Sequence, residues 1–312
     1  MSLYSGFGRR VPGPVEFGLA LLLFALVSPG TAAGQASALS AVDSLGNRLV
    51  LTTPAVRVVS FSPGATEALF AMGAGSGIVA TSSDCDYPDE ARALKSLTLG
   101  ADSAELAFDL HDMKSDLLVV EGGLYRSRPL FWNRFQVPVF VWDPQDFVAL
   151  ARAVMNIGIL VEKTDAAIKI ASTITETVKR TRLVTDSLPS DRRPRVVWLT
   201  SNDVPVVYGS KSMAQAMIEA AGGTNVFWEI DEATAVVDWN SIVAGEPQII
   251  LVPYSVGELG LDGRMPGEIL ELQWNFPPNV GFVDAALTTR GSPRATTGLL
   301  QIARKLHPES FP

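Results

Sequence analysis

RVVSFSPGATE, residues 57–67, is the stretch that decides the fold of this chain. Its first part, Arg57–Phe61, is short and rich in β-branched residues, which predicts a strand buried on both faces. Ser62-Pro63-Gly64 follows, and an early proline with the acidic Glu67 close behind predicts the start of a helix. A buried strand that turns directly into a helix is the repeating unit of an α/β protein.

The same alternation recurs further along the chain, on both sides of a long segment without strand signals. Apolar runs at 78–81, 116–120 and 137–142 predict further strands in the first half, and runs at 195–200 and 248–252 do so in the second half. Strands that alternate with helical stretches predict mainly parallel sheets covered by helices.

The segment without strand signals predicts the connection between the two halves. Apolar residues recur at helical spacing from Phe147 to Ile157, and a second helix is expected near Thr164, capped by Asp165. About 20 helical residues span roughly 30 Å, the width of a small domain. We therefore predict an α/β fold of two α/β lobes with mainly parallel sheets, joined by one long connecting helix, with a ligand cleft between the lobes. The expected parts are an N-terminal lobe at 39–145, a connecting helical segment at 146–190 and a C-terminal lobe with a closing helix at 191–312.

Residues 1–38 are expected to be a signal peptide and its cleavage region. Arg9 and Arg10 precede an apolar run at 17–27, and small residues follow it. This order is typical of a secretory signal peptide, here with cleavage after Ala33 or Ala38. The apolar run is much shorter than the roughly 20 residues that span a bilayer, and an uncleaved anchor is the alternative. We expect an exported, periplasmic protein.

The composition excludes several classes of function. The 312 residues are 47% hydrophobic and 19% charged, as in a folded protein, and suffice for about two domains. Because 33 acidic residues outnumber 25 Lys and Arg, nucleic acid is not an expected partner. One cysteine and two histidines exclude a thiolate metal cluster and a disulfide framework. No resident cofactor or metal is predicted, and a monomer is expected.

The motifs that could carry catalysis are weak. GAGSG at 73–77 lies after a predicted helix and before a strand, which is the reverse of the order in a dinucleotide loop. GSKS at 209–212 lacks the upstream glycine of a phosphate loop, so we expect a turn and a helix cap. A Ser-His-Asp site would have to use His111 or His307, each expected at a surface or helix end, and no nucleophile elbow accompanies either. We predict no catalytic residues and no enzyme activity.

Aromatic side chains, by contrast, gather where predicted strands end. These are Phe61, Tyr87, Trp142, Trp198, Tyr208 and Tyr254, with Trp239 just before a helical stretch. Ligands of open α/β sheets bind beyond the carboxyl ends of the strands, where aromatic rings offer flat apolar area. Core packing is the alternative for each ring, above all for Trp198, which lies within a strand.

Four segments together carry a family resemblance that extends over about residues 42–311. They are RVVSFSPGATEALFAMGAG (57–75), TSSDCDYPDEA (81–91), YGSKSMAQAMIEAAGGTNVF (208–227) and GSPRATTGLLQIARKLHPESF (291–311). As a set they resemble the substrate-binding proteins of ABC importers, in the subgroup with a rigid helical backbone that serves cobalamin, ferric siderophores and haem. The Cys85-Asp86-Tyr87-Pro88 segment is most similar to the cobalamin-binding branch.

The resemblance implies a periplasmic protein that captures a corrinoid, a ligand like vitamin B12, and delivers it to an ABC permease in the inner membrane. Binding and release would be its whole mechanism, with little opening and closing of the lobes. Cleft positions implied in the first lobe are Ser62, Pro63, Gly64, Asp86, Tyr87, Glu121, Gly122 and Gly123. In the second lobe they are Tyr208 and the segment around Trp239. Trp142 and Tyr254 join this set as strand-end aromatic residues.

The sequence departs from the family pattern at three places. Relatives carry a glutamate on each lobe that pairs with permease arginines, whereas the matching positions here are Arg126 and Asn240. Glu121, Asp238 or Glu232 are acidic residues that could substitute. The aromatic and acidic pair that precedes the closing Ser-Pro-Arg in relatives is absent from DAALTTRGSPR (284–294). The alternatives are therefore a ferric siderophore or haem as ligand, with Tyr208 or Tyr87 as iron ligand, or a non-transport sensory or interaction protein on the same fold.

Overall fold

The computed structural model describes residues 38–99, 103–201, 204–254 and 272–311. The expected signal peptide therefore lies outside the described residues, apart from Ala38. Within the described ranges, no helix combines the length and the apolar character that crossing a bilayer requires.

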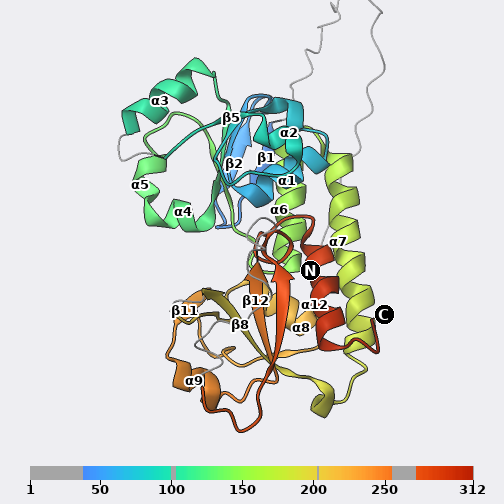
Figure 1. The fold of residues 1–312 in the computed structure, drawn as a ribbon. Helices are drawn as coiled ribbons and strands as arrows, with labels where there is room; N and C mark the ends of the chain where they lie inside the picture. The colour runs from blue at the N-terminus through green and yellow to red at the C-terminus, as the bar shows by residue number, and fades with distance from the viewer. Residues whose placement is uncertain (1–37, 100–102, 202–203, 255–271, 312) are drawn as a thin grey trace, which may run out of the picture. The chain divides into compact units, whose positions relative to one another are not determined.

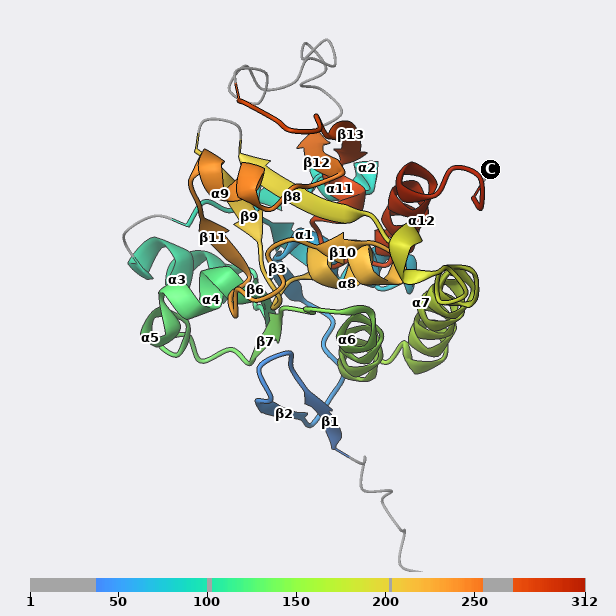
Figure 2. The same cartoon turned by 90° about the horizontal axis from the view of Figure 1, so that it is seen from below.

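The first lobe is built on a parallel sheet with the strand order β5-β4-β3-β6-β7 (Figures 1 and 2). Its strands are β3 (Val58–Phe61), β4 (Ile78–Thr81), β5 (Lys95–Ser96), β6 (Leu117–Glu121) and β7 (Val139–Trp142). Its helices are α1 (Pro63–Ala71), α2 (Asp89–Arg92), α3 (Ser103–Asp112), α4 (Gly122–Ser127) and α5 (Pro129–Trp132), with a 3-10 turn at Gly75–Gly77. The predicted strand–helix step is confirmed, because β3 is buried throughout and the Ser62 side chain caps α1 with Pro63 in its first turn.

Two apolar layers enclose this sheet. On one face Val58, Leu117 and Phe140 pack with apolar residues of α1 and of α6 (Phe147–Leu160). On the other face Val59 and Leu118 pack with apolar residues of α3 and α5. Because side chains alternate between the faces of a strand, burial on both sides fixes the sheet and holds its carboxyl edge in place.

A hairpin that the sequence pattern did not reveal precedes the sheet. β1 (Leu39–Val42) and β2 (Arg48–Leu51) pair in antiparallel register. The Asp43 carboxylate accepts hydrogen bonds from the backbone N–H groups of Leu45, Asn47 and, on β7, Val141. This buried aspartate ties the hairpin turn to the edge strand of the sheet.

The connection between the lobes consists of α6 and α7 (Thr164–Thr185). Asp146 caps α6 by accepting from the N–H of Ala149 at 2.7 Å, as a helix start requires. The expected cap by Asp165 is wrong: Asp165 lies inside the first turn of α7, and the cap position is Lys163, whose side chain makes no capping hydrogen bond. An acid in the first turn still favours the helix through its dipole. α7 packs against α6 and also against α8 and α12 of the second lobe (Figure 1).

The second lobe contains a mixed sheet with the order β11-β9-β8-β12-β13, and β10 also pairs with β8. Its strands are β8 (Arg195–Ser201), β9 (Val206–Tyr208), β10 (Thr224–Asn225), β11 (Thr234–Val236), β12 (Ile249–Tyr254) and β13 (Asn279–Asp284). Its helices are α8 (Met213–Ala220), α9 (Trp239–Ala244), α11 (Ala285–Thr288) and α12 (Ala295–Leu306), and a 3-10 turn at Ser190–Arg192 precedes β8. β8, β10, β12 and β13 pair in parallel, whereas β9 pairs antiparallel with both of its neighbours, β8 and β11. The predicted α/β fold with two lobes and mainly parallel sheets is therefore confirmed.

Candidate ligand-binding site

A cavity of about 250 Å³ lies between the two lobes. The first lobe contributes residues that follow β3, β6 and β7 directly, at the carboxyl ends of three adjacent parallel strands. The second lobe contributes the segment that follows β9 and the segment between α11 and α12. This is where an open α/β sheet is expected to bind a ligand.

Six of the residues expected from the sequence line this cavity. They are Ser62, Pro63, Gly64, Glu121, Trp142 and Tyr208. Of these, Trp142 is almost wholly buried, and its indole N–H donates to the carbonyl of Gly291 in the other lobe at 2.7 Å. Trp142 is thus a wall of the cavity that also ties the lobes together.

The other expected positions lie outside the lining. Gly122 packs against Asp143, and Gly123 faces open space. Trp239 is the first residue of α9 and packs, partly buried, against the core on the far face of the second sheet. Tyr254 ends β12, also partly buried. Asp86 contacts the lining residue Arg290, and Tyr87 lies against Arg294, which is outside the lining.

The cavity also has lining residues that sequence reasoning missed. They are Asp143, Pro144 and Gln145 after β7, Lys211, Ser212 and Met213 at the start of α8, Ala233, and Thr289, Arg290 and Gly291 before α12. The first three continue directly from Trp142, so the strand-end rule could have found them. The segment at 209–212 was correctly expected to turn and cap a helix, since Ser212 caps α8, but it also faces the cavity.

The two lobes meet backbone to backbone beside the cavity. A Cβ added at Gly64 would lie 2.5 Å from the Gly291 oxygen and 3.0 Å from Trp142 Nε1, which is closer than real Cβ atoms approach. A Cβ on Gly291 would in turn lie 2.5 Å from a ring carbon of Pro144. Only glycine therefore fits on both sides of this contact.

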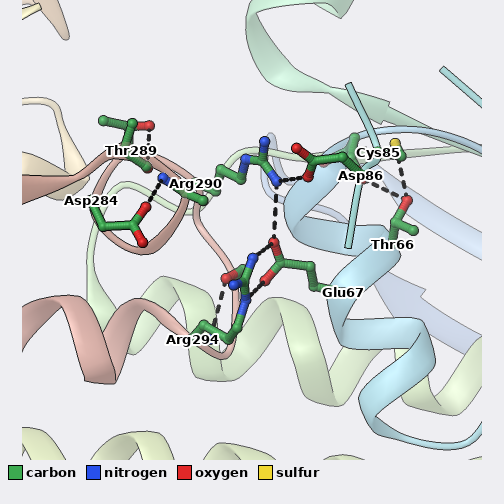
Figure 3. A network of polar contacts seen from close by, with 12 residues as sticks. Thr66, Glu67, Cys85, Asp86, Asp284, Thr289, Arg290 and Arg294 are labelled. Atoms are coloured by element: carbon green, nitrogen blue, oxygen red, sulfur yellow. Dashed lines mark hydrogen bonds and ion pairs between the residues drawn. The ribbon is translucent and has the colours of Figure 1, made fainter. Parts of the chain in front are cut away.

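Two arginines of the second lobe bind acidic groups of the first lobe (Figure 3). Arg294 donates to Glu67 through two nitrogens, Nε to Oε2 at 2.8 Å and Nη2 to Oε1 at 2.6 Å. Arg290 lies 3.5 Å from the same carboxylate and also donates to Asp86. The hydrogen bond from Arg290 lowers the pKa of Asp86. The Arg294 guanidinium lies 3.6 Å above the centre of the Tyr87 ring, a cation–π arrangement.

Most charged groups at the cavity are paired. Arg126, at one of the positions where relatives carry a glutamate, forms an ion pair with Asp143, and Lys211 pairs with Asp231 at 2.8 Å. Asn240, at the other such position, is exposed on α9. Burial, followed by the nearby Asp143, raises the pKa of Glu121.

Tyr208 and Trp198 form an aromatic pair behind the second-lobe wall, with ring centroids 5.6 Å apart in an edge-to-face arrangement. Burial raises the pKa of Tyr208 to about 12. Trp198 is buried in β8, as expected of a residue within a strand.

Neither histidine lines the cavity. His111 is in α3, and His307 is buried at the end of α12, with Nε2 3.3 Å from the Gly222 carbonyl. The expectation of a surface or helix-end residue is confirmed for both, because His111 is exposed and His307 caps the end of α12. Across the described ranges, no three His, Cys, Asp or Glu side chains are grouped so that they could hold a metal ion.

Two α/β lobes with a cavity between them define a two-lobed ligand-binding protein. A family profile described as periplasmic binding protein matches residues 58–262, and the chain belongs to this family. A vitamin B12-binding protein of Yersinia pestis (strain Pestoides F) is 25% identical over 210 residues, which cover 65% of this chain and 72% of that protein.

Solved structures agree on the fold. The periplasmic vitamin B12 binding protein of Vibrio cholerae superposes with a TM-score of 0.68 at 22% identity, covering 82% of this chain and 98% of that one. A periplasmic haem-binding protein from Pseudomonas aeruginosa gives a TM-score of 0.67 at 16% identity, covering 82% and 94%. The family resemblance seen in the sequence is therefore confirmed at the level of fold and family.

Proposed function

We propose that this protein captures a corrinoid in the periplasm and delivers it to an ABC importer. The observation that carries the proposal is the cavity between the lobes, lined by Trp142 and Tyr208. Segments that resemble the family supply part of its lining, and Asp86 of the segment most similar to the cobalamin-binding branch contacts the lining residue Arg290. The vitamin B12-binding relative from Yersinia pestis supports the same ligand class. Export would depend on the segment at 1–38, and binding and release would need no covalent chemistry.

Haem is the second candidate, because haem-binding proteins share the fold. Its iron would need a phenolate ligand from Tyr208 or Tyr87. A pKa of about 12 disfavours the phenolate of Tyr208. At that residue the protein therefore favours the corrinoid over haem, and Tyr87 is the tyrosine left for an iron ligand.

The size of the cavity adds a condition to the proposal. At about 250 Å³ it lies below the roughly 300–1,000 Å³ of pockets for drug-sized ligands, and a corrinoid is larger than those. We infer that a corrinoid enters only when the lobes separate at the contact between Gly64 and Gly291.

The proposed permease partner would have to be recognised differently from the family pattern. Arg126 is half exposed and engaged with Asp143, and Asn240 is neutral. Asp238 is exposed, and its carboxylate caps α9 by accepting a hydrogen bond from the N–H of Ser241. Glu232 is an exposed alternative.

The experiment is a titration of the purified protein with cyanocobalamin, followed by tryptophan fluorescence and calorimetry, with haem and a ferric siderophore as comparison ligands. We expect one-to-one binding tighter than about 1 μM. Tyr208→Leu should weaken it about 10-fold or more, whereas Trp228→Ala, an exposed aromatic residue outside the cavity, should not change it. Tighter binding of haem or of the siderophore than of cyanocobalamin would refute the corrinoid proposal.

A further inference from the structure

The charges around the cavity leave one carboxylate without a counter-ion. Both cations in the lining are satisfied by acids outside it, Arg290 by Asp86 and Glu67 and Lys211 by Asp231. Asp143, which also lines the cavity, is held by Arg126. Among the described residues, Glu121 at the end of β6 has neither an ion pair nor a hydrogen bond to its carboxylate, although it faces the same cavity.

A second acceptor in the cavity wall is also unsatisfied. The amide oxygen of Gln145 is buried, and no group within the described ranges donates a hydrogen bond to it. Gln145 follows β7, and Glu121 ends β6, its neighbour in the sheet, where Glu121 and Trp142 are register partners. A buried acceptor without a donor destabilises the fold by roughly 1–3 kcal/mol, so such a group is expected to have a partner in the working state.

We propose that Glu121 and Gln145 select a ligand that presents neutral N–H donors to this wall and reject one that presents carboxylates there. The inference rests on the proposed function, since a corrinoid carries primary amides around its ring, whereas haem carries propionates and many siderophores are anionic. An amide N–H can donate to a carboxylate oxygen and to an amide oxygen alike. A ligand carboxylate would instead meet the carboxylate of Glu121, which is solvent-exposed in the free protein and would repel it as a like charge when ionised.

The charge of Glu121 carries an energetic cost in the free protein. Burial raises the pKa of Glu121, and the neighbouring Asp143 and Asp84 raise it further. Both effects work against the ionised carboxylate in the absence of a ligand. Glu121→Gln should accordingly unfold at a higher temperature than the parent protein.

The test uses two pairs of probes that differ only in amide or acid. One pair is cyanocobalamin and its derivatives in which a single peripheral amide is hydrolysed to the acid; the other is haem diamide and haem. We expect haem diamide to bind about 10-fold or more tightly than haem. Cyanocobalamin should bind about 10-fold or more tightly than at least one of its acid derivatives. Glu121→Gln should bring both ratios close to one, and Gln145→Leu should weaken amide binding about 2–10-fold. Glu105→Gln, an exposed acid on α3, is the matched control and should change nothing.

The outcomes separate this inference from the proposed function. A preference for haem diamide over haem without corrinoid binding would refute the proposed function and keep the charge selection. Corrinoid binding with equal affinity for amides and acids, or with ratios that Glu121→Gln leaves unchanged, would overturn the charge selection alone. If no member of either pair binds, both ideas are wrong.

Discussion

Removing the charge of Glu67 is the perturbation whose effect the structure defines most closely. The Glu67 side chain is only 2% exposed, and it receives both nitrogens of Arg294, with Arg290 3.5 Å away. Breaking a buried ion pair by removing one partner costs about 3–5 kcal/mol. The arginine side chains are 26% and 21% exposed, and Arg290 keeps Asp86, so the lower end applies. We expect Glu67→Gln to lower the free energy of unfolding by about 3 kcal/mol, which corresponds to a fall in Tm of roughly 5–10 °C.

Urea unfolding at neutral pH measures this loss, and a surface ion pair provides the control. Glu176 and Arg180 lie one turn apart on α7, with side chains 64% and 78% exposed, so Glu176→Gln should cost less than about 0.5 kcal/mol. If Glu67→Gln is no more destabilising than Glu176→Gln, the ion pair between the lobes does not stabilise the protein and the reasoning fails.

Two further predictions concern the same boundary between the lobes. Gly64→Ala should destabilise the protein by about 1–3 kcal/mol, since its Cβ would meet the Gly291 backbone. The control is Gly123→Ala, at the same position of α4 with nothing within 4 Å of the added Cβ, which should be neutral or slightly stabilising in thermal unfolding. Equal effects of the two substitutions would contradict the steric argument. Asp86 has its pKa lowered by the hydrogen bond from Arg290, so its contribution to stability is present above the unfolded value of 3.8 and is lost as pH falls through the folded pKa. The stability difference between the parent and Asp86→Asn, measured by urea unfolding at several pH values, should therefore shrink below pH 3.8, and a difference independent of pH would argue against the ion pair.

The fold could be predicted largely because its central elements carry strong local signals. β3 is a run of apolar and β-branched residues followed at once by a capping serine and a proline, and α6 begins at a capping aspartate. Most of the strands that were missed have two to four residues, and β13, which is as long as β12, is largely only partly buried. Exposed positions in β2 and β11 also break up the apolar pattern that marks a buried strand. Their pairing depends on partners elsewhere in the chain, which a local pattern does not contain.

The candidate site also has residues that could be predicted from the sequence and residues that could not. Residues at the ends of strands in the first sheet, such as Ser62 and Glu121, could be placed near the cavity because parallel strands share one carboxyl edge. Tyr208 ends the antiparallel strand β9, so this rule does not cover it, and the family resemblance is what pointed to it. Arg290 and Gly291 could not, because Gly291 reaches Trp142 across 149 residues of sequence. Only the assembled fold brings the two together. Trp239 and Tyr254 are not among the residues that line this cavity, and a strand end or a helix start in the sequence does not determine which side of the sheet a ring takes.

The contact between Gly64 and Gly291 means that the measured affinity depends on how readily the two lobes separate as well as on the ligand. A ligand larger than the cavity binds only the fraction of molecules in which these backbones have parted, so the measured Kd is the intrinsic Kd divided by that fraction. Changes that loosen the contact without touching the cavity would then tighten binding while they lower stability. Residues such as Glu67, which does not itself line the cavity, would in this way influence the ligand concentration at which the protein fills and empties.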